Sequence, residues 1–181
     1  MSQPADPIVV ALICLARLWL AWSWSNQETP MKIIEILQPS AVIDELSGST
    51  AQGALTELCR PLAAKGLDSQ HLLESLLARE KLGSTGIGDG VAIPHGRVPG
   101  LPSLSATFGR SKSGIDFSAI DEKPTFLFFT LFGPERPAGI HLAALARISQ
   151  VLKAPSVREA LRQAKDAAEI YQIIEAEDAR V

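Results

Sequence analysis

The chain is poor in the residues that mark several protein classes. It has only two cysteines, Cys14 and Cys59, and they form no motif, which excludes a disulfide framework and a zinc knuckle. Its formal net charge is only −3 and no basic stripe is present, which argues against a nucleic-acid partner. The apolar run from Ile8 to Trp22 is interrupted by Arg17 and is shorter than the roughly 20 residues of a membrane span. We therefore expect a cytoplasmic protein whose domain does not insert into a membrane.

Residues 1–30 differ in kind from the rest of the chain, because all three tryptophans lie there. No basic residue precedes the apolar run, whereas a signal peptide begins with positive charge. The only methionine after the first is Met31. We favour an over-extended start codon, with the working protein beginning at Met31 and residues 1–30 forming an unstructured or helical extension. A membrane anchor or an uncleaved targeting segment is the alternative.

The remainder of the chain alternates between helical and strand patterns. With 46% apolar residues it can bury one good core, which predicts a single α/β domain. Apolar spacing predicts helices over 51–62, 68–79, 142–152, 157–161 and 170–174. Pro61 should kink or shorten the first of these helices, and Asp68 should cap the second. Strands are expected over 91–93, 104–110 and 125–132, and the last, apolar without alternation, should be a central strand.

The most informative segment runs from Gly83 to Arg97. Its five glycines, Gly83, Gly86, Gly88, Gly90 and Gly96, can take positive φ, so that backbone N–H groups can converge on an anion, and the turn from Gly86 through Gly88 to Gly90 is the expected phosphate-binding part. The segment lacks both the Gly-Lys-Ser/Thr ending of a P-loop and the third glycine of a dinucleotide fingerprint. It therefore predicts a phosphate-binding turn whose only nucleophile is a histidine, His95, held at a strand end.

His95 can offer a neutral imidazole lone pair to phosphorus. Arg79, in the last turn of a predicted helix, can hold two phosphate oxygens at once, and its alternative role is that of a surface cation. Arg97 could bind phosphate or face water. A purely structural His95 is the alternative, but the glycines around it would then carry an unneeded entropic cost.

A metal site built from His95, His141, Asp89 and Asp121 is an alternative to phosphate chemistry at His95. No His-x-x-x-His, Glu-x-x-His or Cys-x-x-Cys spacing supports it. We predict neither a metal nor a cofactor.

The stretch Arg79-Glu-Lys-Leu-Gly-Ser-Thr-Gly-Ile-Gly-Asp-Gly-Val-Ala-Ile-Pro-His-Gly-Arg97 resembles the phosphorylation-site signature of the phosphotransferase-system enzyme IIA family of the fructose/mannitol type. Within that family it is most similar to the nitrogen-regulatory branch. The resemblance continues through Gly114-Ile-Asp-Phe117, Asp121-Glu-Lys-Pro124 and His141-Leu-Ala-Ala-Leu145, and covers residues 31–178. It implies a three-layer α/β/α domain with a mixed sheet between helical layers.

The chain departs from the family in two places. Residues 1–30 have no counterpart in it. Gly133 stands where an aliphatic residue is expected before Pro134, which bears on the shape of the pocket rim.

The resemblance implies a phosphocarrier. Nε2 of His95 would accept a phosphoryl group from an HPr-like phosphohistidine protein, while Arg79 and the glycine-turn amides stabilise the transferring group. His141 would orient His95 or contact the phosphate, and its alternative role is that of a polar helix-entry residue.

We favour a regulatory output, in which the phosphorylation state governs binding to other proteins such as transporters or kinases. One alternative is a sugar-specific IIA component that passes the phosphate to a IIB domain. Another is a non-catalytic module that senses an anion without covalent chemistry.

Overall fold

The computed structural model describes residues 31–136 and 138–181. Residues 1–30, on which the predictions about the start site and the extension fall, lie outside the described residues. The strands are β1 Leu37–Ile43, β2 Gly86–Gly88, β3 Val91–Ala92, β4 His95–Arg97, β5 Ser105–Ile115 and β6 Thr125–Gly133. The helices are the 3-10 turn η1 Ile33–Glu35 and α2 Ala51–Ala63, α3 Ser69–Glu80, α4 Ala138–Val151, α5 Pro155–Gln163 and α6 Ala167–Asp178.

The six strands form one mixed sheet in the order β1-β5-β6-β3-β2, with β4 also paired to β6. β1 runs parallel to β5, and both β3 and β4 run parallel to β6. The β2–β3 and β5–β6 pairs are antiparallel. β6 is therefore central, with β5 along one edge and β3 followed by β4 along the other, as its apolar sequence predicts.

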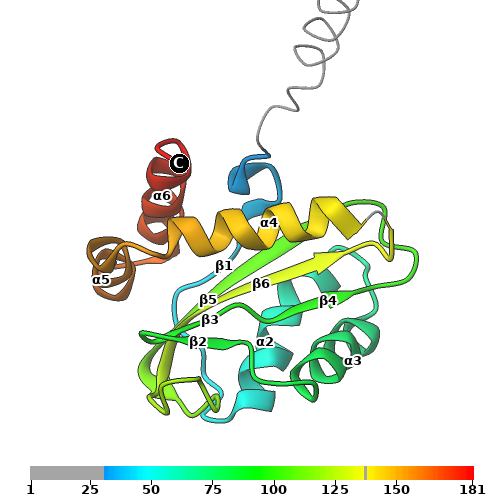
Figure 1. Ribbon diagram of the computed structural model, residues 1–181, viewed down its shortest axis with the longest axis horizontal. Helices are drawn as coiled ribbons and strands as arrows, with labels where there is room; N and C mark the ends of the chain where they lie inside the picture. The colour runs from blue at the N-terminus through cyan, green and yellow to red at the C-terminus, as the bar shows by residue number, and fades with distance from the viewer. Residues whose placement is uncertain (1–30, 137) are drawn as a thin grey trace, which may run out of the picture. The chain divides into compact units, whose positions relative to one another are not determined.

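Helices cover both faces of this sheet (Figure 1). α2 and α3 pack against each other and against β5 and β4 on one face. On the other face α4 and α5 contact β6, and α6 contacts β1. This arrangement is the expected α/β/α layering around a mixed sheet.

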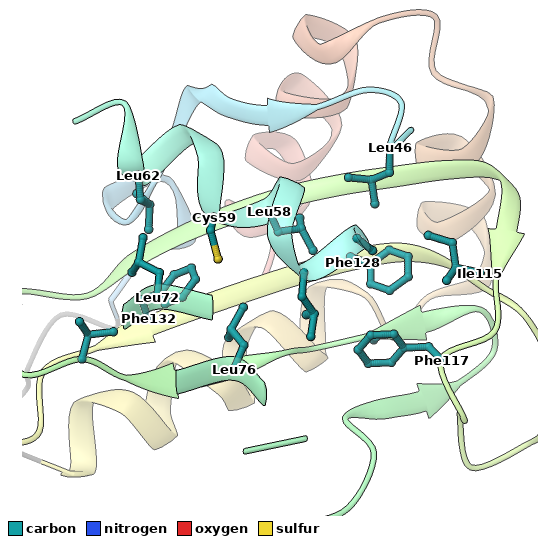
Figure 2. Packing of buried hydrophobic residues seen from close by; sticks show 14 of the residues in the cluster. Leu46, Leu58, Cys59, Leu62, Leu72, Leu76, Ile115, Phe117, Phe128 and Phe132 are labelled. Carbon is teal, nitrogen blue, oxygen red and sulfur yellow. The ribbon is translucent and has the colours of Figure 1, made fainter. Parts of the chain in front are cut away.

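The core beneath α2 and α3 is built from leucine and phenylalanine side chains (Figure 2). Leu58 and Leu72 come from the two helices, and Phe128 comes from β6. The rings of Phe117 and Phe128 meet edge to face with centroids 5.3 Å apart. This packing fixes α3 over the sheet, and α3 carries Arg79.

Two arginines, the buried Arg110 and the partly buried Arg147, stabilise the opposite layer. The Arg110 guanidinium donates to the carbonyls of Leu161, Arg162 and Ala164, at the carboxyl end of α5. Cations are favourable at this end of a helix because its carbonyls lack partners. Arg147 of α4 donates from Nε to Asp178 Oδ1 at 2.7 Å, which ties α4 to α6.

Several expected elements are confirmed. α2 continues two residues beyond Pro61, which lies in its last turn. Asp68 caps α3 by accepting from the amides of Gln70 and His71. One detail of the predicted apolar stripe is wrong: Leu142 is 68% exposed, because the buried face of α4 carries His141 and Ala144 instead. No helix of the described residues is long and apolar enough to cross a membrane.

Candidate active site around His95

A break in the sheet edge positions His95. β3 ends at Ala92 and β4 begins at His95, and the chain between them passes through Pro94, which has no N–H to give to a ladder. The carbonyl of Ile93 is thereby left to accept from Nδ1 of His95 at 2.9 Å. The imidazole is held, as the sequence predicts, but at the start of a separate strand, β4, rather than at the end of the strand before it.

Arg79 reaches the other nitrogen of this ring. Its Nε–H donates to Nε2 of His95 at 2.9 Å. An arginine is always a donor, so Nε2 is the acceptor and the ring hydrogen lies on Nδ1, facing Ile93. The lone pair of the imidazole is therefore on Nε2.

The contact depends on how closely α3 approaches β4. A Cβ added to Gly96 would overlap the hydroxyl of Ser75 and would lie 2.9 Å from its Cβ. Ser75 is one helical turn before Arg79, so the same close approach that needs a glycine at position 96 brings the guanidinium to His95. The sequence does not single out Ser75, and it singles out Gly96 for positive φ, which Gly96 does not take.

The loop after α3 fixes the guanidinium from the other side. Nη1 of Arg79 donates to the carbonyl of Gly83 at 2.9 Å. Glu80 closes the same loop by accepting from the amide of Thr85 at 2.8 Å and from its hydroxyl at 2.6 Å. In the sequence, these Glu80–Thr85 hydrogen bonds are indicated only by a threonine that follows Gly83 by two residues.

His141 is the fourth residue of α4 and lies beside His95. The two ring centroids are 5.8 Å apart and the rings are tilted by 55°. His141 is only 6% exposed, and its Nδ1 has no hydrogen-bond partner among the described residues. The structure thus brings His95, Arg79 and His141 together from three separate elements, β4, α3 and α4.

Both imidazoles are neutral at pH 7. Burial lowers the pKa of His95; the Ile93 carbonyl opposes this shift, the Arg79 cation adds to it and the Glu80 carboxylate opposes it. The pKa of His141 falls from 6.5 to about 4, chiefly through burial and then through its neighbours His95 and Arg97. A neutral His95 is the form that has a lone pair to share.

These side chains line a pocket of about 530 Å³. Its rim is apolar, since Leu82 is 84% exposed and Leu142 is 68% exposed. Arg97 also lines the pocket, where it donates to the carbonyl of Glu135. Sequence reasoning missed both rim leucines, because an exposed leucine cannot be distinguished from a core leucine by spacing alone.

The glycines of the predicted phosphate-binding turn do not line this pocket. Gly86, Gly88 and Gly90 lie in and around the β2–β3 hairpin, where Gly88 and Gly90 take φ of 86° and 76°. The amide N–H of Gly86 is already occupied, because it donates to the hydroxyl oxygen of Ser84 at 3.1 Å. A phosphate-binding role for these glycines stays a prediction to which the lining of the pocket adds no support.

The acidic residues considered as metal ligands lie in the hairpin region and have other partners. Oδ2 of Asp89 accepts from Arg158 at 2.9 Å, and Oδ2 of Asp121 accepts from the amide of Asp89 at 3.0 Å. Among residues 31–136 and 138–181, no three His, Cys, Asp or Glu side chains gather so that they could hold a metal ion.

The amino-acid sequence matches the model of a known protein family. Residues 35–177 match the family model of the phosphoenolpyruvate-dependent sugar phosphotransferase system, EIIA 2. The chain belongs to this family. The resemblance that the residues around His95 predicted is therefore confirmed, and members of the EIIA type-2 family are components of a phosphotransferase system.

Relatives of this EIIA chain include a nitrogen regulatory protein and a fructose-specific component of a phosphotransferase system. It is 39% identical over 145 residues to the nitrogen regulatory protein of Bradyrhizobium diazoefficiens, covering 80% of this chain and 95% of that protein. It is 34% identical over 150 residues to the fructose-specific EIIABC component of Bacillus subtilis, covering 82% of this chain but 24% of that protein. The crystal structure of nitrogen regulatory protein IIA-Ntr from Neisseria meningitidis matches with a TM-score of 0.74 at 36% identity, covering 78% of this chain and 98% of that one.

Proposed function

We propose that this EIIA chain is a cytoplasmic phosphocarrier of a nitrogen-regulatory phosphotransferase system. His95 accepts a phosphoryl group from an HPr-like phosphohistidine protein, and the phosphorylation state of His95 controls binding to regulated proteins such as transporters or kinases. The observation that carries the proposal is the hydrogen-bonding pattern of one imidazole. Nδ1 is tied to the Ile93 carbonyl, while the Nε2 lone pair faces a guanidinium in an open pocket.

The transfer step balances without an external proton. The Nε2 lone pair of His95 forms the new N–P bond, and the breaking N–P bond returns its electron pair to the imidazole of the donor. The hydrogen on Nδ1 stays where it is, held by Ile93. Because phosphoryl transfer needs chiefly positioning and charge stabilisation, a ring fixed at Nδ1 supplies the first requirement.

Arg79 supplies the second requirement by exchanging partners. In the unphosphorylated protein its Nε–H is occupied by Nε2 of His95. When phosphorus takes that lone pair, the same N–H is released at the distance of a hydrogen bond from the incoming oxygens. A planar guanidinium can then bind two of them, and Arg97, which lines the same pocket, adds a second cation.

His141 has a supporting role in this proposal. The ring centroids of His141 and His95 are 5.8 Å apart, the separation of neighbouring aromatic rings, so a neutral His141 is close enough to meet oxygens that extend from Nε2. The exposed leucines on the rim, Leu82 and Leu142, suit the docking of a donor that presents apolar side chains around its own phosphohistidine.

Labelling tests the acceptor directly. The purified chain is incubated with radioactive phosphoenolpyruvate, enzyme I and the HPr-like carrier. We expect label on the wild type and none on His95→Ala. His71→Ala is the matched control, because His71 is an exposed histidine of α3 outside the pocket, and it should label normally. Label that survives in His95→Ala would refute the assignment.

Intact-mass measurement separates this proposal from an anion-sensing module. A phosphohistidine adds a covalent mass that acid removes and base does not, whereas a bound anion is lost on denaturation. Coupling between ³¹P and ¹⁵N in the labelled ring should place phosphorus on Nε2. Coupling to Nδ1 would show that the Ile93 carbonyl does not hold the ring hydrogen on Nδ1.

The regulatory output is favoured by the similarity to a nitrogen regulatory protein over 95% of its length. The similarity to a fructose-specific component keeps a sugar-transport role as the second candidate, in which a IIB domain takes the phosphate. The chain is expressed in cells that lack a fructose or mannitol IIA. Restored sugar uptake would favour the second candidate, and no restoration is expected.

A further inference from the structure

The ring of His141 lies directly on the backbone at the end of β6. A Cβ added to Gly133, the last residue of that strand, would overlap Nδ1 of His141 and would lie 3.3 Å from its Cε1. The third of the three nearest atoms is Cδ2 of Leu104 at 3.0 Å, which is the far end of a flexible side chain. The imidazole therefore occupies the space that any other residue at position 133 would need.

The backbone of Gly133 does not itself require glycine. Gly133 is not among the residues with positive φ, and it pairs with Arg97 in the regular parallel ladder between β4 and β6. Its carbonyl accepts from the amide of Val98 at 2.9 Å. A glycine inside a strand weakens the strand, and a common reason for one is the close approach of another group. Here that group is an imidazole.

The depth of the ring determines what it can touch. His141 is 6% exposed and lines the pocket beside His95, and its ring lies against the sheet at Gly133. Because the sheet blocks movement in the other direction, a side chain at position 133 would push the ring into the pocket, toward His95 and the rim.

We propose that Gly133 is a positioning residue: by having no side chain, it lets the imidazole of His141 lie against β6, and so sets the gap between the two active-site rings. The ring centroids are 5.8 Å apart, so oxygens of a phosphoryl group on Nε2 of His95 come within reach of His141. This inference deepens the proposed function and rests on it for the catalytic consequence. The placement of the ring can be measured without any phosphoryl transfer.

The experiment compares Gly133→Ala with Gly139→Ala. Gly139 is the matched control, because it lies at the start of α4 and a Cβ there would meet nothing within 4 Å. We expect the imidazole ¹H–¹⁵N signals of His141 to shift in Gly133→Ala and its titration midpoint to rise toward 6.5 as the ring becomes exposed. The labelling rate of His95 should fall on the order of tenfold or more, because transfer depends on placement to within about an ångström. Gly139→Ala should match the wild type in all three measurements.

Both substitutions are then repeated in a His141→Ala background, where the overlapping ring is absent. The labelling defect that Gly133→Ala adds should disappear there, and if Gly133→Ala alone does not fold, the double variant should fold. Three outcomes would each overturn the proposal. The labelling defect could persist in the His141→Ala background, or the double variant could stay unfolded. The His141 signals could also be unchanged in a folded Gly133→Ala. A wild type that takes no label would refute the proposed function while leaving the His141 titration to decide the role of Gly133.

Discussion

Replacing Arg79 with alanine removes the donor that lies 2.9 Å from Nε2 of His95 and the link to the carbonyl of Gly83. If the guanidinium binds the phosphoryl oxygens during transfer, the loss is that of a hydrogen bond to a charged group, about 1.5–3 kcal/mol. At 1.36 kcal/mol per decade, we expect labelling of His95 to slow by about 10- to 150-fold.

A second effect of the same substitution is too small to explain such a loss. The Arg79 cation lowers the pKa of His95, so its removal lets that pKa rise. Even a full return to the ordinary histidine pKa of 6.5 would leave about three quarters of the rings neutral at pH 7, a loss of about 1.3-fold. Measuring at pH 8 removes this contribution almost completely, so a loss that persists there reports on charge stabilisation alone.

The assay is the initial rate of label transfer at pH 7 and pH 8, with Arg60→Ala as the matched control. Arg60 is also an arginine in the last turn of its helix, but it is 71% exposed and lies outside the pocket. Arg79→Lys keeps the charge without the planar fork and should fall between alanine and the wild type. A folded Arg79→Ala that labels within twofold of the wild type at both pH values would refute the role given to the guanidinium.

Two further outcomes follow from the packing and the buried ring. Gly96→Ala should lower the free energy of unfolding by about 1–3 kcal/mol, because its methyl group would have to displace Ser75 and with it α3. The measurement is urea unfolding, and a urea midpoint equal to that of Gly139→Ala would contradict the close packing. The folded-state pKa of His141, about 4, lies below the unfolded value of 6.5, so the stability it contributes is complete above pH 6.5 and is lost as pH falls toward 4, by about 3 kcal/mol. In urea titrations, His141→Gln should lose less unfolding free energy than the wild type as pH falls from 6.5 toward 4. His71→Gln is the control, because His71 is exposed, and it should behave as the wild type does. Equal losses in the wild type and both variants would show that other groups cause the pH dependence.

The sequence predicted the parts of the fold whose signals are local. The cap at Asp68, the cation in the last turn of α3 and the unbroken apolar run of β6 each depend on a few neighbouring residues, and each is found. β1 was not predicted, because the polar residues in Leu37-Gln-Pro-Ser-Ala41 break both periodicities. β2 and β4 are only three residues long, too short for a pattern to repeat.

In the candidate site, too, the sequence predicted the residues whose signals are local and missed those that only the fold brings together. His95 and Arg79 were predicted because both lie within one continuous signature, whereas Leu82 and Leu142 acquire their place on the rim only when α3 and α4 meet across β4 and β6. The apolar stripe of α4 was misplaced at Leu142 because spacing alone gives the period of a buried face, and which residues occupy that face depends on what the helix packs against.

Glycine is the residue type whose meaning changed most between sequence and structure. Sequence reasoning valued glycines for positive φ and pointed to the hairpin, where Gly88 and Gly90 do take it. The two glycines that shape the pocket, Gly96 and Gly133, have ordinary strand conformations and are required by what lies against them, Ser75 and His141. Close approach is a property of two segments that are distant in sequence, so no local pattern contains it. It follows that substitutions at the hairpin glycines should disturb a turn, whereas substitutions at the two strand glycines should move α3 with Arg79 and the ring of His141.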